Sequence, residues 1–176
     1  MDDQRPDPDA LLKRVQAEEA RQSEGKLKVS QNAVKVSVEK IYVKDLSLEN
    51  PGSPQSFRLT EPPSIELGIR TRAEQIEPDV YECVMTVTVT ATAKDRTVFL
   101  VEVAQAGIFT VHGSTPETLQ PVLAMHCPAM LFPYARQQIA AAVMNAGYPA
   151  VQLSPINFEA LYAQQLAQKA GEPAPA

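Results

Sequence analysis

Few side chains in this chain of 176 residues carry the groups that catalysis or metal binding needs. The cysteines and histidines number two each: Cys83, Cys127, His112 and His126. Structural zinc usually takes four Cys or His ligands, so a site here would need carboxylates as well. His126 next to Cys127 is more typical of helix packing. We expect no metal and no cofactor, and we expect both thiols to stay reduced in a cytoplasmic protein.

The sequence also lacks the motifs of common enzyme classes. It contains no G-x-S-x-G nucleophile elbow, no P-loop, no H-E-x-x-H zinc motif and no dinucleotide-binding fingerprint. His112 is the one candidate general base, and its position near the end of a predicted strand favours a surface residue. We therefore expect a protein that acts by binding, and we keep an enzyme as the rival hypothesis.

The charge balance points to a class of partner. The net charge is −5, and Lys and Arg are scattered without a basic stripe. Nucleic-acid binding depends on neutralising phosphates and is disfavoured here, whereas an acidic surface attracts basic polypeptide segments. No apolar run approaches the ~20 residues of a membrane span, so no membrane insertion is expected. The opening MDDQRPDPDALLKR lacks the apolar core of a secretory signal, and a cytoplasmic localisation is the default.

Glu102 is the most informative carboxylate. It lies in the apolar segment VFLVEVA and shares the parity of Leu100, so both side chains lie on one face of a strand. The residues of opposite parity are Phe99, Val101, Val103 and Gln105. An unpaired carboxylate buried in such a segment would be strongly destabilising, so its face must be hydrated or paired. Taken alone, it is an ordinary charge on a solvated face.

Four strands are expected in the middle of the chain. In the first, Val34, Val36 and Val38 alternate with polar residues, and the apolar parity then changes at Ile41 and Val43. A bulge near Glu39 and Lys40 would explain the change, as would a strand covered on both faces. The other strands are predicted over residues 64–72, 81–91 and 97–111, with a hairpin turn at 94–96. Residues 50–63 hold four prolines and predict a long irregular connection, which is often functional.

Three helices are expected after the strands. They are predicted over residues 117–130, 133–146 and 158–169, with Pro121 in the first turn of the first helix and Pro133 opening the second. Gly147 is expected to end the second helix, and Asn157 to cap the third after an extended stretch. Sequential strands followed by helices predict an α+β fold with an antiparallel sheet. Residues 1–33 predict a polar, flexible or weakly helical extension, 34–170 a single domain, and 171–176 a disordered tail.

Several segments, in order, resemble the SecB family of bacterial export chaperones from about residue 36 to 168. They are IYVKDLSLENP (41–51), DVYECVMTVTVTA (79–91), FLVEVAQAGIF (99–109), CPAMLFPYAR (127–136) and LSPINFEALY (153–162). The resemblance implies a four-stranded antiparallel sheet with helices on one face, assembled as a homotetramer, a dimer of dimers. It implies a chaperone that holds unfolded precursor proteins and delivers them to the motor SecA, without a cofactor.

The resemblance also implies roles for individual residues. An acidic patch that docks SecA corresponds to Asp45 and Glu49, expected just after the first strand, with Leu100 and Glu102 on the fourth. Three further residues match positions that influence tetramer formation: Val101, Val103 and Gln105. A client groove is expected between the long connection and the second helix, with three candidate residues: Phe57, Leu59 and Phe132. The chain has no Trp, although many relatives carry one in this connection.

One alternative stays open within the same family. A SecB-like chaperone can be dedicated to one partner, such as the antitoxin of a toxin–antitoxin system. The joint presence of Asp45, Glu49, Leu100 and Glu102 favours the general export role.

Overall fold

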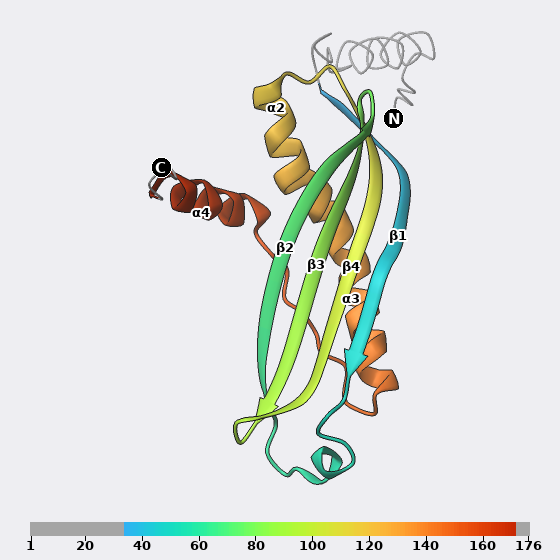
Figure 1. Ribbon diagram of the computed structural model, residues 1–176, viewed down its shortest axis with the longest axis vertical. Helices are drawn as coiled ribbons and strands as arrows, with labels where there is room; N and C mark the ends of the chain where they lie inside the picture. The colour runs from blue at the N-terminus through green and yellow to red at the C-terminus, as the bar shows by residue number, and fades with distance from the viewer. Residues whose placement is uncertain (1–33, 172–176) are drawn as a thin grey trace, which may run out of the picture. The chain divides into compact units, whose positions relative to one another are not determined.

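A computed structural model describes residues 34–171 of the chain (Figure 1). In chain order the elements are β1 (Lys35–Glu49), η1 (Gln55–Arg58), β2 (Ser64–Glu77), β3 (Val80–Ala93), β4 (Arg96–His112), α2 (Pro116–Pro121), the π-helical turn η2 (Val122–His126), α3 (Cys127–Asn145) and α4 (Phe158–Gly171). The predicted extension lies outside the described residues, as does the predicted tail apart from Gly171.

The four strands form one antiparallel sheet in the order β1-β4-β3-β2. The turn between β3 and β4 is the predicted one, and Lys94 and Asp95 in it have φ values of 50° and 62°. The second strand is longer than predicted and runs on to Glu77, because residues 73–77 continue to pair with β3. The fold class is confirmed: a four-stranded antiparallel sheet carries a C-terminal helix, α3, packed against one face.

β1 follows a five-residue repeat. Its apolar residues occur as the pairs Val36 and Val38, Ile41 and Val43, and Leu46 and Leu48. The register with β4 shifts once between Val38 and Lys40 and again between Val43 and Asp45. Each bulge adds one residue and so returns the next apolar pair to the helix-covered face. The predicted bulge near Glu39 is confirmed, and the one at Lys44 was missed.

The core lies between the sheet and α3 (Figure 1). Residues of one parity on β3 and β4 are buried, from Cys83 to Ala91 and from Phe99 to Val111. The helix contributes a stripe of its own: Leu131, Ala135, Ile139 and Val143, all fully buried. This spacing of three to four residues is that of one helix face, as the sequence pattern predicts.

The prediction of two helices separated before Pro133 is wrong. Helical structure is continuous from Pro116 to Asn145, and Pro133 lies inside α3. Proline removes one backbone hydrogen bond, but the buried residues on both sides of Pro133 keep the helix together. Pro121 ends α2 rather than lying in its first turn, and the wider turn η2 follows it directly. This turn changes the phase of the helix, and His126, for which helix packing was predicted, is exposed.

Two of the predicted signals at helix ends, Gly147 and Asn157, are confirmed. Gly147 has a φ of +93°, and the Tyr148 amide donates to the Val143 carbonyl at 3.2 Å, as at a Schellman helix end. The Asn157 side chain accepts a hydrogen bond from the Ala160 amide at 2.9 Å and caps α4.

A substitution at Gly107 tests the packing of the sheet against α3. A Cβ atom there would lie 2.7 Å from the ring of Phe109 and 3.0 Å from a methyl group of Leu131. We expect Gly107→Ala to lower the free energy of unfolding by about 1–3 kcal/mol in urea titrations, because both neighbours are buried and cannot give way. Gly68→Ala is the matched control, because its Cβ would meet nothing closer than 3.7 Å. Equal effects of the two substitutions would contradict this packing.

Candidate partner-binding face of the sheet

The face of the sheet that points away from α3 carries all four residues of the predicted docking patch. In the pairing of β1 with β4, Asp45 lies opposite Ala104, and Glu49 lies opposite Leu100. Glu102 lies between them, opposite Ser47. Residues directly opposite each other in an antiparallel pair share a face. Asp45, Glu49, Leu100 and Glu102 therefore form one surface, which we call the acidic face.

The positions of Asp45 and Glu49 differ from the prediction in one respect. Both lie within β1 rather than after it, because pairing with β4 continues to Glu49. The bulge at Lys44 decides on which face they appear. Without the extra residue, Leu46 and Leu48 would share the face of Tyr42, and Asp45 and Glu49 would point toward α3.

Glu102 is both partly hydrated and paired, as its position in an apolar segment requires. Its side chain is 32% exposed. The hydroxyl of Thr88 donates to Glu102 Oε2 at 2.6 Å, and Arg70 Nη2 approaches the same oxygen at 3.4 Å. Asp45 and Glu49 are exposed, and within residues 34–171 neither takes part in an ion pair.

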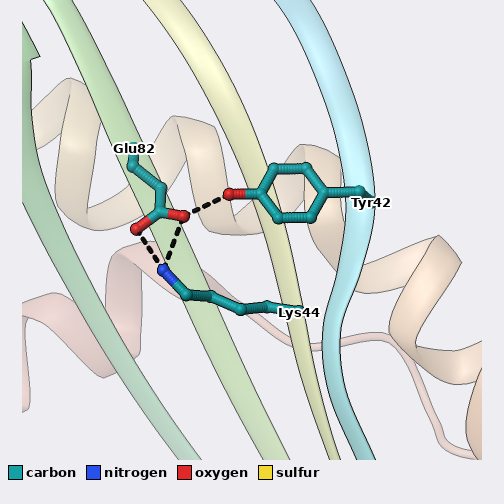
Figure 2. Close-up of polar contacts among 3 residues, drawn as sticks. All are labelled: Tyr42, Lys44 and Glu82. Atoms are coloured by element: carbon teal, nitrogen blue, oxygen red, sulfur yellow. Dashed lines mark hydrogen bonds and ion pairs between the residues drawn. The ribbon is translucent and has the colours of Figure 1, made fainter.

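A second polar cluster lies on the same face and was missed from the sequence. Figure 2 shows Tyr42 and Lys44 of β1 reaching across β4 to Glu82 of β3. Lys44 Nζ donates to both carboxylate oxygens of Glu82 at 2.7 Å, and the Tyr42 hydroxyl donates to Oε1. Ala106, directly opposite Tyr42 on β4, is fully buried, and its small side chain leaves room for this bridge.

The cluster has a defined charge state. The hydrogen bonds from Lys44 and then Tyr42 hold the pKa of Glu82 below its usual range, against the effect of burial. The hydrogen bond to Glu82 raises the pKa of Tyr42 in turn. Lys44 is the extra residue of the second bulge, so this ion pair holds the bulge in place. The change of apolar parity between Val43 and Leu46 was the signal that could have revealed it.

The three candidate assembly residues lie on the helix-covered face. Val101 and Val103 are fully buried, and Gln105 is 2% exposed. The side-chain amide of Gln105 donates to the Tyr42 carbonyl at 2.8 Å, next to the second bulge. These residues pack in the core of the single chain, so an effect on assembly would act through the position of α3 and β1.

The three candidate groove residues lie at two places. Phe57 of η1 is 50% exposed, and its ring lies 5.1 Å from that of Tyr148 just after α3. Leu59, two residues further on, is 38% exposed. Phe132 is 6% exposed and packs edge-on against Phe158, about 20 Å along α3 from Gly147. A groove joining all three would have to run along the helix.

The cysteines and histidines offer no reactive constellation in the described part of the chain. Cys83 and Cys127 are buried and free, and their mutual hydrogen bond, together with burial, raises the pKa of the Cys83 thiol far above its usual range. His112 is an exposed strand-end residue, as predicted, with Nδ1 3.2 Å from Asp79 Oδ2. Between residues 34 and 171, no three His, Cys, Asp or Glu side chains gather as ligands for a metal ion. None of the helices in this range combines the length and apolar character that a membrane crossing requires.

Comparison with known proteins identifies the family. The family model described as preprotein translocase subunit SecB matches residues 29–169. The chain belongs to the SecB family. The protein-export protein SecB of Azoarcus sp. (strain BH72) is 51% identical over 136 residues, covering 77% of this chain and 90% of the relative. The SecB of Dechloromonas aromatica (strain RCB) is 48% identical over 137 residues, covering 78% and 90%.

A solved structure shows the same fold. It is the SecB-like chaperone Rv1957 of Mycobacterium tuberculosis, in complex with a ChAD peptide from the Rv1956 HigA1 antitoxin. It aligns with a TM-score of 0.58 at 16% identity, over 86% of this chain and 100% of that chain. The SecB-like fold is therefore confirmed.

Replacing Glu82 tests the polar cluster beside the bulge. We expect Glu82→Gln to lower the free energy of unfolding by about 1–3 kcal/mol at pH 7, because hydrogen bonds to a charged group are lost. The folded-state pKa of Glu82 lies below its unfolded value, so the stabilisation is present above about pH 4.5 and is lost as the pH falls through the folded pKa. Urea titrations from pH 7 downward at fixed protein concentration should show the difference from wild type shrinking.

Glu74→Gln is the matched control for this prediction. Glu74 is exposed and lies opposite Glu82 in the register of β2 and β3. It should change stability by less than about 0.5 kcal/mol at any pH. A pH-independent loss in Glu82→Gln would show that the cluster does not stabilise the protein through the charge of Glu82.

Proposed function

We propose that this chain is a protein-export chaperone that binds unfolded precursor proteins, keeps them translocation-competent and delivers them to SecA. Membership of the SecB family and relatives named protein-export protein SecB support the export role. One observation supports delivery to SecA: four residues lie together on the face of the sheet that α3 does not cover, namely Asp45, Glu49, Leu100 and Glu102. The chaperone acts in the cytoplasm by binding alone, without a cofactor.

The acidic face suits a basic docking segment. Its carboxylates lie on the adjacent strands β1 and β4, and Asp45 and Glu49 are exposed. Charges arranged in this way speed the encounter with a cationic partner and select its sign. Leu100, half-buried among them, supplies apolar contact that charge alone cannot give.

Exposed apolar side chains supply the surface for clients and for assembly. On the helix side of the two edge strands, five are about 40% exposed: Val38, Val43 and Leu46 on β1, and Ile65 and Leu67 on β2, at opposite edges of the sheet. Phe57 and Leu59 are exposed apolar residues of the long connection between these two strands. Exposed apolar groups gathered in patches mark interaction sites. We propose that homotetramer formation, as a dimer of dimers, covers part of them and that unfolded clients cover the rest.

Several weak client contacts on one tetramer would act together. Once one segment of a client is bound, the others are held at high effective concentration, which gives tight holding without sequence specificity. In this proposal residues 34–170 are the chaperone domain, and residues 1–33 and 171–176 are not part of it.

The alternative is a chaperone dedicated to one partner. The Rv1957 chaperone was solved with an antitoxin peptide, but at 16% identity its likeness concerns the fold. Export chaperones about 50% identical to this chain favour the general role. An effect on the folding of several unrelated precursors would distinguish general from dedicated binding.

Reversing the charge of Glu102 tests delivery. We expect Glu102→Lys to weaken SecA binding at least about 10-fold in a calorimetric titration, because it removes an attraction and adds a repulsion. The same charge reversal at Glu74, at the other end of the same face, should have a much smaller effect. Client affinity should be unchanged in both. Wild-type SecA affinity in Glu102→Lys would rule out the acidic face as the docking site.

Truncating the exposed side chains of the long connection tests client binding. Phe57→Ala with Leu59→Ala should weaken the binding of an unfolded precursor about 30-fold, at roughly 1 kcal/mol for each half-buried apolar contact. Ile76→Ala, on a residue equally exposed near the far end of β2, should have little effect. Retardation of precursor refolding is the measurement, with tetramer mass by light scattering as the check on assembly. Unchanged retardation would place the client surface elsewhere.

A further inference from the structure

The acidic face contains a cation of its own. Arg70 of β2 approaches Glu102 Oε2 on β4 at 3.4 Å, although the strand β3 lies between β2 and β4. The row of directly paired residues that contains Glu102 runs from Ser47 through Glu102 and Thr88 to Gly68. Gly68 places no side chain at the end of this row, and a Cβ there would meet only Thr88, at 3.7 Å. Arg70, in the next row, therefore meets no obstacle from Gly68.

The geometry of this contact is that of a displaceable ion pair. The Arg70 side chain is 77% exposed, and among residues 34–171 its one side-chain hydrogen bond is with Glu102. An exposed pair of this kind contributes little to folding, because water screens it and the long side chain loses entropy in forming it. Thr88 donates a shorter hydrogen bond to the same oxygen, so Glu102 stays oriented without Arg70.

Arg70 should weaken the binding of a cationic partner, whereas the carboxylates of the acidic face strengthen it. An incoming ammonium or guanidinium group must displace Arg70 from Glu102 Oε2, or bind beside it against like-charge repulsion. Asp45 and Glu49 carry no such competitor in residues 34–171. Glu102 is thus the carboxylate of the acidic face whose charge is already partly neutralised.

We propose that Arg70 sets the affinity of the acidic face by competing, within the chain, with the cationic segment of the partner for Glu102. The proposal rests on the proposed function, in which that partner is SecA. Replacing Arg70 should therefore give a tighter, longer-lived complex. In the native sequence, Arg70 keeps the affinity lower than the carboxylates alone would make it.

The test compares two arginines of the same strand. Arg72 lies on the same face as Arg70, two residues along β2, and is opposite Val84 rather than near Glu102. Arg70→Gln and Arg72→Gln remove the same charge, but Arg72 acts electrostatically on Glu82 rather than pairing with Glu102. Once urea titrations show the two variants to be equally stable, their difference reports the contact with Glu102. In calorimetric titrations with SecA, Arg70→Gln should tighten binding about two- to five-fold, or about 0.4–1 kcal/mol, and Arg72→Gln should do so by less than about two-fold. In a Glu102→Gln background, Arg70→Gln should do no more than Arg72→Gln.

The outcomes separate this inference from the proposed function. Suppose Glu102→Gln weakens SecA binding, but Arg70→Gln raises the SecA affinity no more than Arg72→Gln does. The proposed competition by Arg70 is then overturned, and the acidic face is still supported as the docking site. Weaker binding in Arg70→Gln also overturns it, and would make Arg70 a contact or positioning residue. If Glu102→Gln leaves SecA binding unchanged, both the docking face and the competition are overturned.

Discussion

The two bulges of β1 are the constraint on which the rest of the structure depends. An antiparallel strand with one covered face must keep its apolar residues on that face, and one extra residue reverses every side chain that follows. The apolar pairs of β1 recur every five residues, and the extra residues at Glu39 and Lys44 return each pair to the helix side. The same step brings Asp45 and Glu49 to the open face beside Glu102. Packing and the proposed partner binding thus depend on one register, which the ion pair of Lys44 with Glu82 stabilises.

The two faces of the sheet differ in their packing and in their polar contacts. On the helix-covered face, the two central strands pack against α3, and Gln105 is a buried polar residue there, whose amide donates to the β1 backbone at Tyr42. The open face carries no helix and is crossed by two polar contacts, from β1 to β3 at Glu82 and from β2 to β4 at Glu102. The first ties the strands together in a buried setting. The second is exposed and exchangeable, and this difference in burial separates a structural ion pair from one that a partner can replace.

Local pattern was enough to predict the four strands, the C-terminal end of α3, the start of α4 and the face on which Glu102 lies. Alternation in β3 and β4 needed only parity, and Gly147 and Asn157 act through their own backbone and side-chain chemistry. Pro133 misled the prediction, because the burial of α3 on the sheet outweighs the local cost of a proline, and burial is not visible in a window of a few residues. The Tyr42, Lys44 and Glu82 cluster and the Arg70 contact join residues 32–40 positions apart, so they depend on strand order and register. The second parity change in β1 was visible in the sequence, but its consequence for Asp45 and Glu49 required the pairing with β4.

Residues of β1 and β4 form a single acidic surface, which we propose docks a cationic partner. This is tested by the salt dependence of SecA affinity for the wild-type protein and for a variant that combines Asp45→Asn, Glu49→Gln and Glu102→Gln. The account predicts that wild-type affinity falls steeply as salt is raised, because exposed charges are screened. It predicts weak binding with a shallow salt dependence for the variant, with client holding intact. Wild-type affinity and the wild-type salt slope in the variant would contradict it.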